Sequence, residues 1–338
     1  MTQFVPLFRV SSILPFVSFL DKIGAPTQQF LHQAKIPVAT LDNSENLISW
    51  YSGVKFIDDI ARREGIKSLG LEVGLQTPLE QLGSYGRLLR HSLTLFELFS
   101  LVEKLHHLFS SAAQVSLKYY GDYAWICHSF LAPRTMLCCQ ESHYTVMLYL
   151  NVIKLIAGNE WQPSQIQMTS KKYDFLTNID QFSDTKFRFE QATNAICFPR
   201  AFLSRSLRHF NSYSDSQRQQ DRKLLQATAP ALDFPRSIQQ VLRYLLRGGY
   251  PNIELAAEIA GMSVRSFQRC LGREGLTYTR MVEQVRFDAA IDYLQDPNIK
   301  IIEIALELGY QDPANFSRAF KRWTGISPNE YREQHCNN

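Results

Sequence analysis

The segment 301–332 constrains the fold of this chain more than any other. Apolar residues recur in it at helical spacing until Gly309 interrupts the pattern. Asp312 and Pro313 follow, and they suit the start of a second helix, because a carboxylate can cap a helix and a proline fits its first turn. The pattern predicts a helix-turn-helix motif over 301–322. The second helix is expected to expose Ala314, Asn315, Arg318 and Lys321 and to bury Phe316, Ala319, Phe320 and Trp323.

A second motif of the same kind is predicted over 253–272. Its first helix ends at Gly261, and Ser263 can cap the helix that follows. That second helix is expected to bury Val264, Phe267 and Leu271 and to expose Arg265, Ser266, Gln268 and Arg269. The residues between the motifs, 277–294, predict a connecting helix about 26 Å long. A connector of this length suits two reading helices in successive major grooves, which lie about 34 Å apart.

The second motif carries a specific resemblance. It rests on Gly309-Tyr310, Asn315-Phe316-Ser317-Arg318, Phe320-Lys321, Gly325, Ser327-Pro328 and Tyr331-Arg332. This run resembles the C-terminal signature of the AraC/XylS family of bacterial transcription regulators, and the resemblance extends over residues 236–332. It implies an all-α DNA-binding domain with two helix-turn-helix motifs joined by a linker helix.

The resemblance also implies which residues face DNA. Those expected to read bases are Arg265, Gln268, Arg269, Ala314, Asn315 and Arg318. Those expected at phosphates are Ser263, Ser266, Lys321 and Arg322. The residue types suit these roles, because arginine matches the O6 and N7 of guanine and glutamine can pair with adenine. Pro313 and Ala314 stand where many relatives carry hydrogen-bonding side chains, so we expect Arg318 to matter less than Arg269. Arg286 of the linker helix is expected to bridge to a carboxylate.

The region before residue 210 predicts an α+β domain in which helices precede a small antiparallel sheet. Helical spacing marks Leu14–Ile23, Thr27–Ala34, Leu47–Arg63, Leu93–Ala113 and Cys138–Ala157. Alternating patterns mark strands at Gln114–Tyr120, Tyr123–Phe130, Gln165–Thr169, Lys186–Gln191 and Ala195–Phe198. Gly121-Asp122 suits a hairpin turn between the first two strands. The aromatic residues around this turn leave open either an apolar cavity or an ordinary core.

A glycine-containing segment, 69–92, resembles the arabinose-binding-type sensor domain found at the amino terminus of one branch of the same family. The resemblance covers about residues 10–200 and implies effector sensing. Sugar-binding members use an all-β barrel, whereas this region starts with helices. Bulky residues separate Gly70 from Gly74 and no lysine–hydroxyl pair follows, so a phosphate loop is not indicated.

Composition sets further limits. The chain has 338 residues and a net charge of +4, and residues 236–338 hold 13 Lys and Arg against 12 Asp and Glu, so a DNA-binding face must come from local clustering. Six cysteines without a regular spacing indicate free thiols in a reducing cytosol. The adjacent His106 and His107 point about 100° apart on a helix and cannot share a metal ion, so no metal or cofactor is expected. No membrane span or signal peptide is indicated.

These observations predict three segments: a sensing or dimerisation domain at 1–210, a polar linker at 211–235 with a short helix near 216–227, and a DNA-binding domain at 236–338. The expected function is a cytoplasmic, nucleoid-associated, sequence-specific transcription regulator, more an activator than a repressor. Its expected partners are promoter DNA, RNA polymerase, a small-molecule effector and a second copy of the chain. The alternatives are a ligand-independent DNA-binding protein, and an enzyme fused to a DNA-binding module, for which residues 1–200 offer no catalytic motif.

Overall fold

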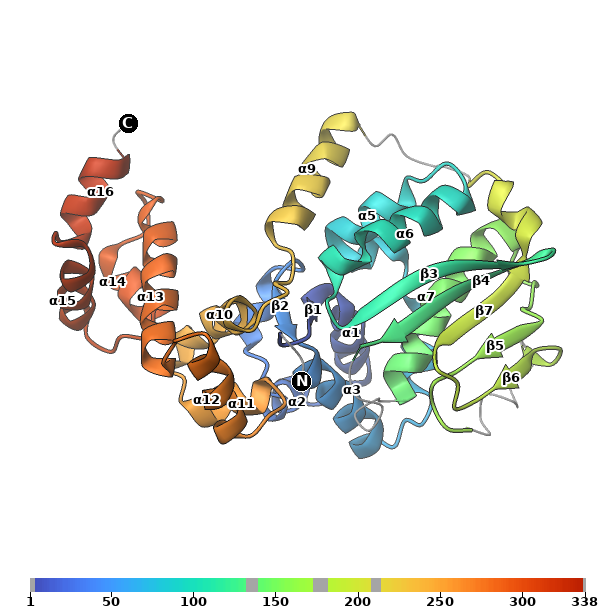
Figure 1. Cartoon of the computed structure of the whole chain (residues 1–338), viewed down its shortest axis with the longest axis horizontal. Coiled ribbons are helices and arrows are strands. Elements are labelled where there is room, and N and C mark those ends of the chain that lie inside the picture. The colour runs from blue at the N-terminus through green and yellow to red at the C-terminus, as the bar shows by residue number, and fades with distance from the viewer. Residues whose placement is uncertain (1–3, 132–138, 173–181, 208–213, 337–338) are drawn as a thin grey trace. The chain divides into compact units, whose positions relative to one another are not determined.

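The chain folds as two compact units in a computed structural model that describes residues 4–131, 139–172, 182–207 and 214–336. One unit is Pro6–Pro230, and the other is Ala231–Asn338 together with Met1–Val5. Figure 1 shows the first as a mixture of helices and strands and the second as helices alone. The predicted fold class, an α+β region followed by an all-α region with helix-turn-helix motifs, is therefore confirmed.

Helices make up most of the first unit before its main sheet. They are α1 (Leu14–Ile23), α2 (Thr27–Gln33), α3 (Trp50–Arg63), α4 (Leu69–Gln76), α5 (Gly83–Arg90) and α6 (Leu95–Phe109). The expectation that one helix begins at Leu47 is wrong. Residues Leu47–Ser49 form strand β2, which pairs antiparallel with β1 (Leu7–Arg9), and α3 begins only after Ser49, whose side chain accepts a hydrogen bond from the backbone N–H of Tyr51.

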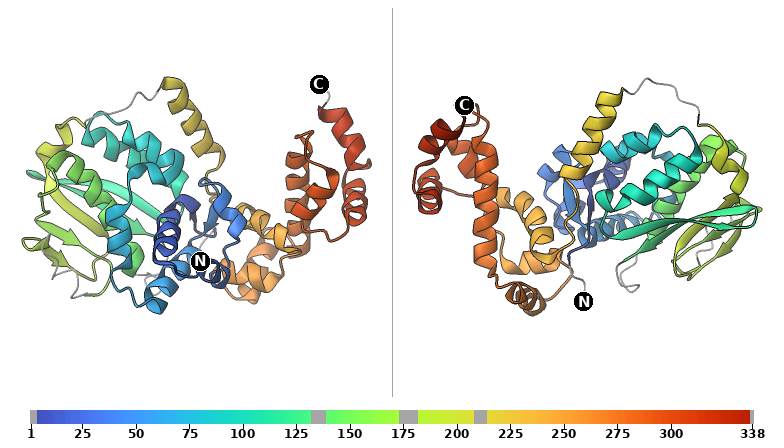
Figure 2. Two further views of the ribbon diagram at one scale, coloured as in Figure 1. Left: turned by 180° about the vertical axis from the view of Figure 1, so that it is seen from behind. Right: turned by 45° about the horizontal axis from the view of Figure 1, so that its top comes forward.

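A five-stranded sheet follows, with the order β3-β4-β7-β5-β6. Its strands are β3 (Ala113–Tyr120), β4 (Tyr123–Phe130), β5 (Gln165–Gln167), β6 (Lys186–Arg188) and β7 (Asn194–Pro199). The predicted hairpin is present, with Tyr120 opposite Tyr123 and Gly121 at a φ of 57° in the turn. The sheet is antiparallel except that β5 and β6 run parallel. Helices α6 and α7 (Cys139–Ala157) pack against it (Figures 1 and 2).

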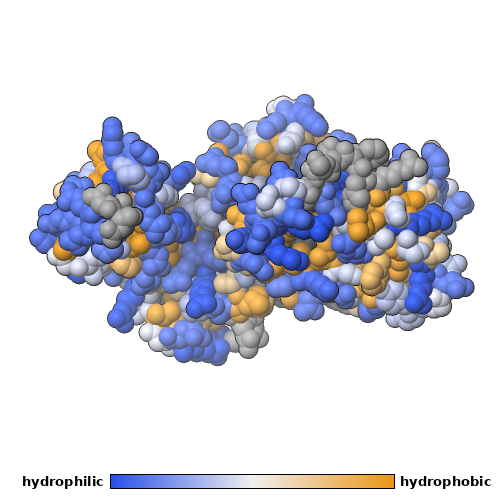
Figure 3. Space-filling model, turned by 90° about the horizontal axis from the view of Figure 1, so that it is seen from above, coloured by the Kyte–Doolittle hydropathy of each residue, from blue (hydrophilic) through white to orange (hydrophobic). Residues whose placement is uncertain are grey.

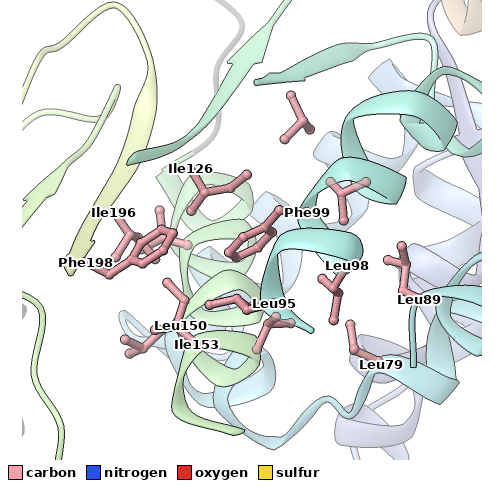
Figure 4. Close-up of a cluster of buried hydrophobic side chains, with 14 of the residues drawn as sticks. Leu79, Leu89, Leu95, Leu98, Phe99, Ile126, Leu150, Ile153, Ile196 and Phe198 are labelled. Atoms are coloured by element: carbon pink, nitrogen blue, oxygen red, sulfur yellow. The ribbon is translucent and has the colours of Figure 1, made fainter. Parts of the chain in front are cut away.

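The main core of this unit lies between the sheet and these helices. Figure 4 shows Phe99 of α6 pointing toward Ile126 and Phe198 of the sheet, while Leu150 and Ile153 of α7 close the cluster. All five side chains are almost completely buried. The aromatic residues at the hairpin tip take no part in this core, because Tyr119, Tyr120 and Tyr123 are exposed. They are therefore neither the cavity lining nor the core that the sequence left open.

The predicted helix within the polar segment 211–235 is α9 (Asp215–Ala227), and it packs on the first unit. The capping box of Ser214 and Gln217 begins it, as local sequence favours. Asp221 is buried, and both its carboxylate oxygens accept hydrogen bonds from Arg87 of α5, at 2.6 and 2.9 Å. Residues 211–213 lie outside the described part of the chain.

The second unit is built from short helices around one long one. They are α10 (Phe234–Leu245), α11 (Ile253–Ile259), α12 (Val264–Arg273), α13 (Tyr278–Leu294), α14 (Ile301–Glu307), α15 (Pro313–Thr324) and α16 (Pro328–Cys336). The long helix α13 contacts α10 on one side and α14 and α16 on the other. Helix α13 therefore connects the two helix-turn-helix motifs within one compact unit.

Candidate nucleic-acid interface

The first helix-turn-helix motif consists of α11 and α12. Asn252 caps α11 through its side-chain oxygen, which accepts from the backbone N–H of Leu255 at 2.8 Å. Gly261, at a φ of 68°, makes the turn that other residues adopt with strain. The inner face of α12 is anchored by Phe267, which is fully buried and contacts the rings of Phe234 and Tyr278 with centroids 5.4 and 5.9 Å away. These contacts anchor α12 to the core of its unit.

The outer face of α12 carries the predicted base-reading side chains. Arg265, Gln268 and Arg269 are all exposed. They lie on one face because residues three and four positions apart are neighbours on a helix. This face offers two guanidinium forks and one amide, and these groups are the donors and acceptors that recognise guanine and adenine in the major groove.

The predicted phosphate contacts on this motif, Ser263 and Ser266, serve first to begin the helix. The Ser263 hydroxyl oxygen accepts from the backbone N–H of Ser266 at 3.3 Å and lies 3.1 Å from its hydroxyl. Ser263 is exposed and Ser266 half-buried. Both lie at the positive end of the α12 dipole, where the free backbone N–H groups of a helix favour an anion.

The second motif consists of α14 and α15. Gly309, at a φ of 75°, lies in the turn, and a Cβ atom there would come within 2.2 Å of the carbonyl oxygen of Leu246. Asp312 caps α15 by accepting from the backbone N–H of Ala314 at 2.9 Å. Phe316 and Phe320 are fully buried, and their ring centroids lie 5.8 Å apart. The sequence predicted both the turn and this burial.

The outer face of α15 is less well supplied with hydrogen-bonding groups. Ala314, Asn315 and Arg318 are exposed, as predicted, but the Arg318 guanidinium already donates to the Asn315 side-chain oxygen. Of the two predicted phosphate contacts, Lys321 is exposed, and Arg322 donates to Glu283 of α13 at 3.0 Å. This exposed ion pair links α15 to α13.

Arg286 of α13 has a structural position, but its partners differ from the expected carboxylate. Its Nε donates to the carbonyl oxygen of Leu308 at 3.0 Å, and its Nη2 to that of Gly309 at 3.4 Å. The guanidinium also lies over the rings of Tyr310 and Tyr250, at 4.4 and 5.3 Å from their centroids. A carboxylate is not needed here, because the carbonyl oxygens just after the end of α14 carry partial negative charge and accept from the guanidinium.

Two further arginines, which the sequence did not single out, hold the same unit together. Arg243 of α10 pairs with Asp292 of α13 at 2.7 Å, and Arg247 pairs with Glu307 of α14. These pairs link α10 to α13 and the residues after α10 to α14. The side of this unit seen in Figure 3 is mostly hydrophilic.

Two tandem helix-turn-helix motifs, each with an exposed polar second helix, define a protein that enters DNA grooves with helices. Comparisons with known proteins agree. Residues 255–334 match the family described as "Helix-turn-helix domain", and residues 24–207 match "Arabinose-binding domain of AraC transcription regulator, N-term". The second match alone covers more than half of the chain, so this chain belongs to the AraC family of transcriptional regulators.

Two sequence relatives and one solved structure are similar to this chain. The ornithine utilization regulator of Pseudomonas aeruginosa is 24% identical over 334 residues, covering 98% of this chain and 97% of its own. The regulator VqsM of the same organism is 39% identical over 83 residues, covering 25% of this chain and 26% of its own. Among solved structures, the regulator CdpR from Pseudomonas aeruginosa is 19% identical with a TM-score of 0.40, covering 91% and 96% of the two chains.

Among the residues that the structure describes, no group of three His, Cys, Asp or Glu side chains is placed to hold a metal ion. The four cysteines described with their side chains, Cys127, Cys139, Cys197 and Cys270, form no disulfide bond. Over the same described ranges, no helix combines the length and the apolar character needed to cross a membrane.

Proposed function

We propose that this regulator recognises a specific operator sequence mainly through α12 and that a small-molecule effector bound in its first unit controls it. The observation that carries the first part is the exposure of Arg265, Gln268 and Arg269 on one face of a capped, well-anchored helix. Such a face can be pre-organised for base edges, so little conformational entropy is lost on binding.

The two helix-turn-helix motifs would then have different roles in DNA binding. Helix α15 presents Ala314, whose side chain cannot form a hydrogen bond, so it has fewer groups for bases than α12. Lys321 and Arg322 would meet phosphates, which adds affinity and salt dependence but no sequence information. We therefore assign sequence reading to the first motif and positioning to the second.

Effector control is supported by the match of residues 24–207 to an arabinose-binding domain. The name of the full-length relative, an ornithine utilization regulator, also points to a metabolite as the signal. A relative named transcriptional activator NphR, from Rhodococcus sp and 31% identical over 99 residues, supports activation rather than repression. In this role the protein would work in the bacterial cytoplasm on promoter DNA, with RNA polymerase and a second copy of itself as partners.

The first experiment is a genome-wide map of DNA fragments bound by the purified full-length protein, with and without a metabolite extract. We expect one shared motif about two helical turns long, bound with a different affinity when the extract is present. Fragments without a common motif would overturn sequence-specific reading, and a shared motif unaffected by extract would favour the ligand-independent alternative.

Variants test the assignment of the reading helix. The substitution Arg269→Ala should weaken binding to the recovered motif by about 1–3 kcal/mol and reduce the difference in affinity between operator and random DNA. Arg318→Ala should cost less, and the matched control Arg236→Ala removes the same charge from an exposed position on α10. A larger effect of Arg318→Ala than of Arg269→Ala would assign the reading to the second motif instead.

A further inference from the structure

The first unit contains a cavity of about 90 Å³. Its wall comes from α3, α5, α6, α7 and the strand β4, and apolar and aromatic side chains form most of it. The volume is smaller than that of the roughly 150 Å³ apolar cavity that admits benzene, so a compact molecule would fill it. The lining also carries several hydroxyl groups, two imidazoles and one carboxyl group. The carboxyl group and the imidazoles are the titratable groups that best indicate which ligand chemistry the cavity can accept.

One of these polar groups is the carboxyl group of Glu141 on α7. Its Oε1 accepts a hydrogen bond from the indole N–H of Trp50 at 2.6 Å, whereas its Oε2 is buried and has no partner within the described ranges. Burial raises the pKa of Glu141 to about 8, although the Trp50 hydrogen bond acts in the opposite direction. A buried acid without a counter-charge is costly to ionise, so a bound cation would satisfy it.

A second polar group is a pair of buried imidazoles, His106 of α6 and His128 of β4. Their ring centroids lie 5.5 Å apart and the rings are nearly perpendicular. The Nε2 of His106 and the Nδ1 of His128 are buried without a partner among the described residues. Burial lowers the pKa of His106 to about 4 and that of His128 well below its usual range, in each case reinforced by a neighbouring histidine. Both rings are therefore neutral at physiological pH and do not repel a cation.

Aromatic rings connect these two polar places. The Trp50 ring lies 6.2 Å from Phe130, and Phe130 lies 4.7 Å from His128, centroid to centroid. Tyr149 is a further lining residue on the same side, 6.1 Å from His128. Electron-rich ring faces attract cations, most strongly when water is excluded. A carboxyl group among aromatic rings is thus better suited to an ammonium group than to a neutral or anionic one.

We propose that this cavity is the effector site and that it takes a compact apolar amine. The ammonium group would lie against Glu141 beside Trp50, the apolar body along Phe130, and a hydroxyl or carbonyl group, where the ligand has one, near His106 and His128. The inference rests on the proposed effector control of this unit and names the class of ligand. A sugar fits poorly, because nearly every carbon of a sugar carries a hydroxyl group and apolar side chains form most of this wall. A carboxylate ligand offers Glu141 no counter-charge.

The proposal includes a proton transfer that can be measured. When a protonated amine binds below pH 8, the neutral Glu141 carboxyl group loses its proton to solvent and the carboxylate pairs with the ammonium group. Binding at pH 7 should therefore release up to one proton per amine. Calorimetric titrations in buffers of different ionisation enthalpy count this proton directly.

The test uses the full-length protein and three compact probes of similar shape: isopropylamine, 2-propanol and acetate. We expect isopropylamine to bind at least tenfold more tightly than the other two, with proton release. Glu141→Gln keeps the shape of the side chain, and it should weaken isopropylamine binding at least tenfold and abolish the proton release. Glu103→Gln, at an exposed position on α6, is the matched control and should change nothing. If Glu141→Gln does not fold, Trp50→Phe provides a second variant that keeps an aromatic ring but removes the N–H donor and should also weaken isopropylamine binding.

Failure of this proposal can be told apart from failure of effector control. Equal binding of 2-propanol or acetate, no binding of isopropylamine, or an unchanged affinity in Glu141→Gln would overturn the amine site. If the metabolite extract still changes operator affinity in that case, effector control stands and only the ligand class is wrong. If isopropylamine binds through Glu141 but neither it nor the extract alters operator affinity, the amine site stands and effector control fails.

Discussion

The buried ion pair between Arg9 and Glu45 gives a quantitative prediction about the stability of the first unit. Arg9 is completely buried, and its Nη1 lies 2.7 Å from a Glu45 oxygen. Glu45 also accepts hydrogen bonds from the backbone N–H and the hydroxyl of Ser84, at 2.7 and 2.8 Å. Arg9 donates in addition to Thr228 and to the carbonyl oxygen of Leu225, so the pair also holds the end of α9.

Replacing Glu45→Gln keeps the volume and one carbonyl oxygen but leaves the Arg9 charge without its counter-ion. Removing one partner of a buried pair costs about 3–5 kcal/mol, and the retained oxygen places this variant near the lower value. That is a large share of a typical unfolding free energy of about 5–15 kcal/mol. The substitution should therefore destabilise the first unit far more than its small size suggests.

The assay is urea unfolding of the full-length protein followed by tryptophan fluorescence, with hydrogen exchange measured along the chain. We expect the transition of the first unit to move down by at least about 1 M urea, and α9 to exchange markedly faster. Glu80→Gln, which disrupts an exposed pair with Arg90, is the control and should cost less than about 1 kcal/mol. A loss below about 1 kcal/mol for Glu45→Gln, or unchanged exchange in α9, would refute the reasoning.

Three further predictions concern single residues. Gly309→Ala should lower the melting temperature clearly more than Gly325→Ala, because both glycines have positive φ but only the first would place a Cβ against a neighbouring backbone; equal shifts would contradict this. Arg286→Lys should lower the unfolding free energy in denaturant by about 1–2 kcal/mol despite the retained charge, because lysine cannot bond two carbonyl oxygens and stack on two tyrosine rings at once. An unchanged unfolding midpoint would show that the positive charge alone suffices. The raised pKa of Glu141 keeps this group protonated in the folded state at pH values where it ionises in the unfolded state. The unfolding free energy should therefore fall as pH rises from about 4.5 to 8, and Glu141→Gln should flatten that slope. Equal pH dependence of the unfolding free energy in the two proteins would assign the titration to another group.

The DNA-binding unit could be predicted well because its signals are local. The cap at Ser263, the Asp312-Pro313 start of α15 and the glycine turns each act within a few residues, so spacing alone located both motifs. Partners distant in sequence were harder to predict. The carbonyls that Arg286 contacts lie more than 20 positions away, and nothing nearby in sequence distinguishes them from a carboxylate.

The first unit was predicted only in outline, for the same reason. Strand β2 was assigned to a helix because its pairing with β1 joins residues about 40 positions apart. His106 was treated as an ordinary helix residue, and its neighbour His107 is indeed exposed, but the contact with His128 comes only from packing α6 against the sheet. Glu141, the one acidic residue of α7, was the signal that could have pointed to the cavity, and its partner Trp50 lies 91 positions away.

The chain passes between its two compact units twice, once at Val5–Pro6 and once at Pro230–Ala231. Val5 is fully buried, and its backbone N–H donates to the hydroxyl of Ser237 at 2.9 Å, within the helical unit. The DNA-binding unit is therefore not one contiguous stretch of sequence. A fragment that begins at residue 231 would lack Val5 and leave the Ser237 hydroxyl without that donor. Fragments of this regulator should therefore include the N-terminal residues if they are to report the behaviour of the intact unit.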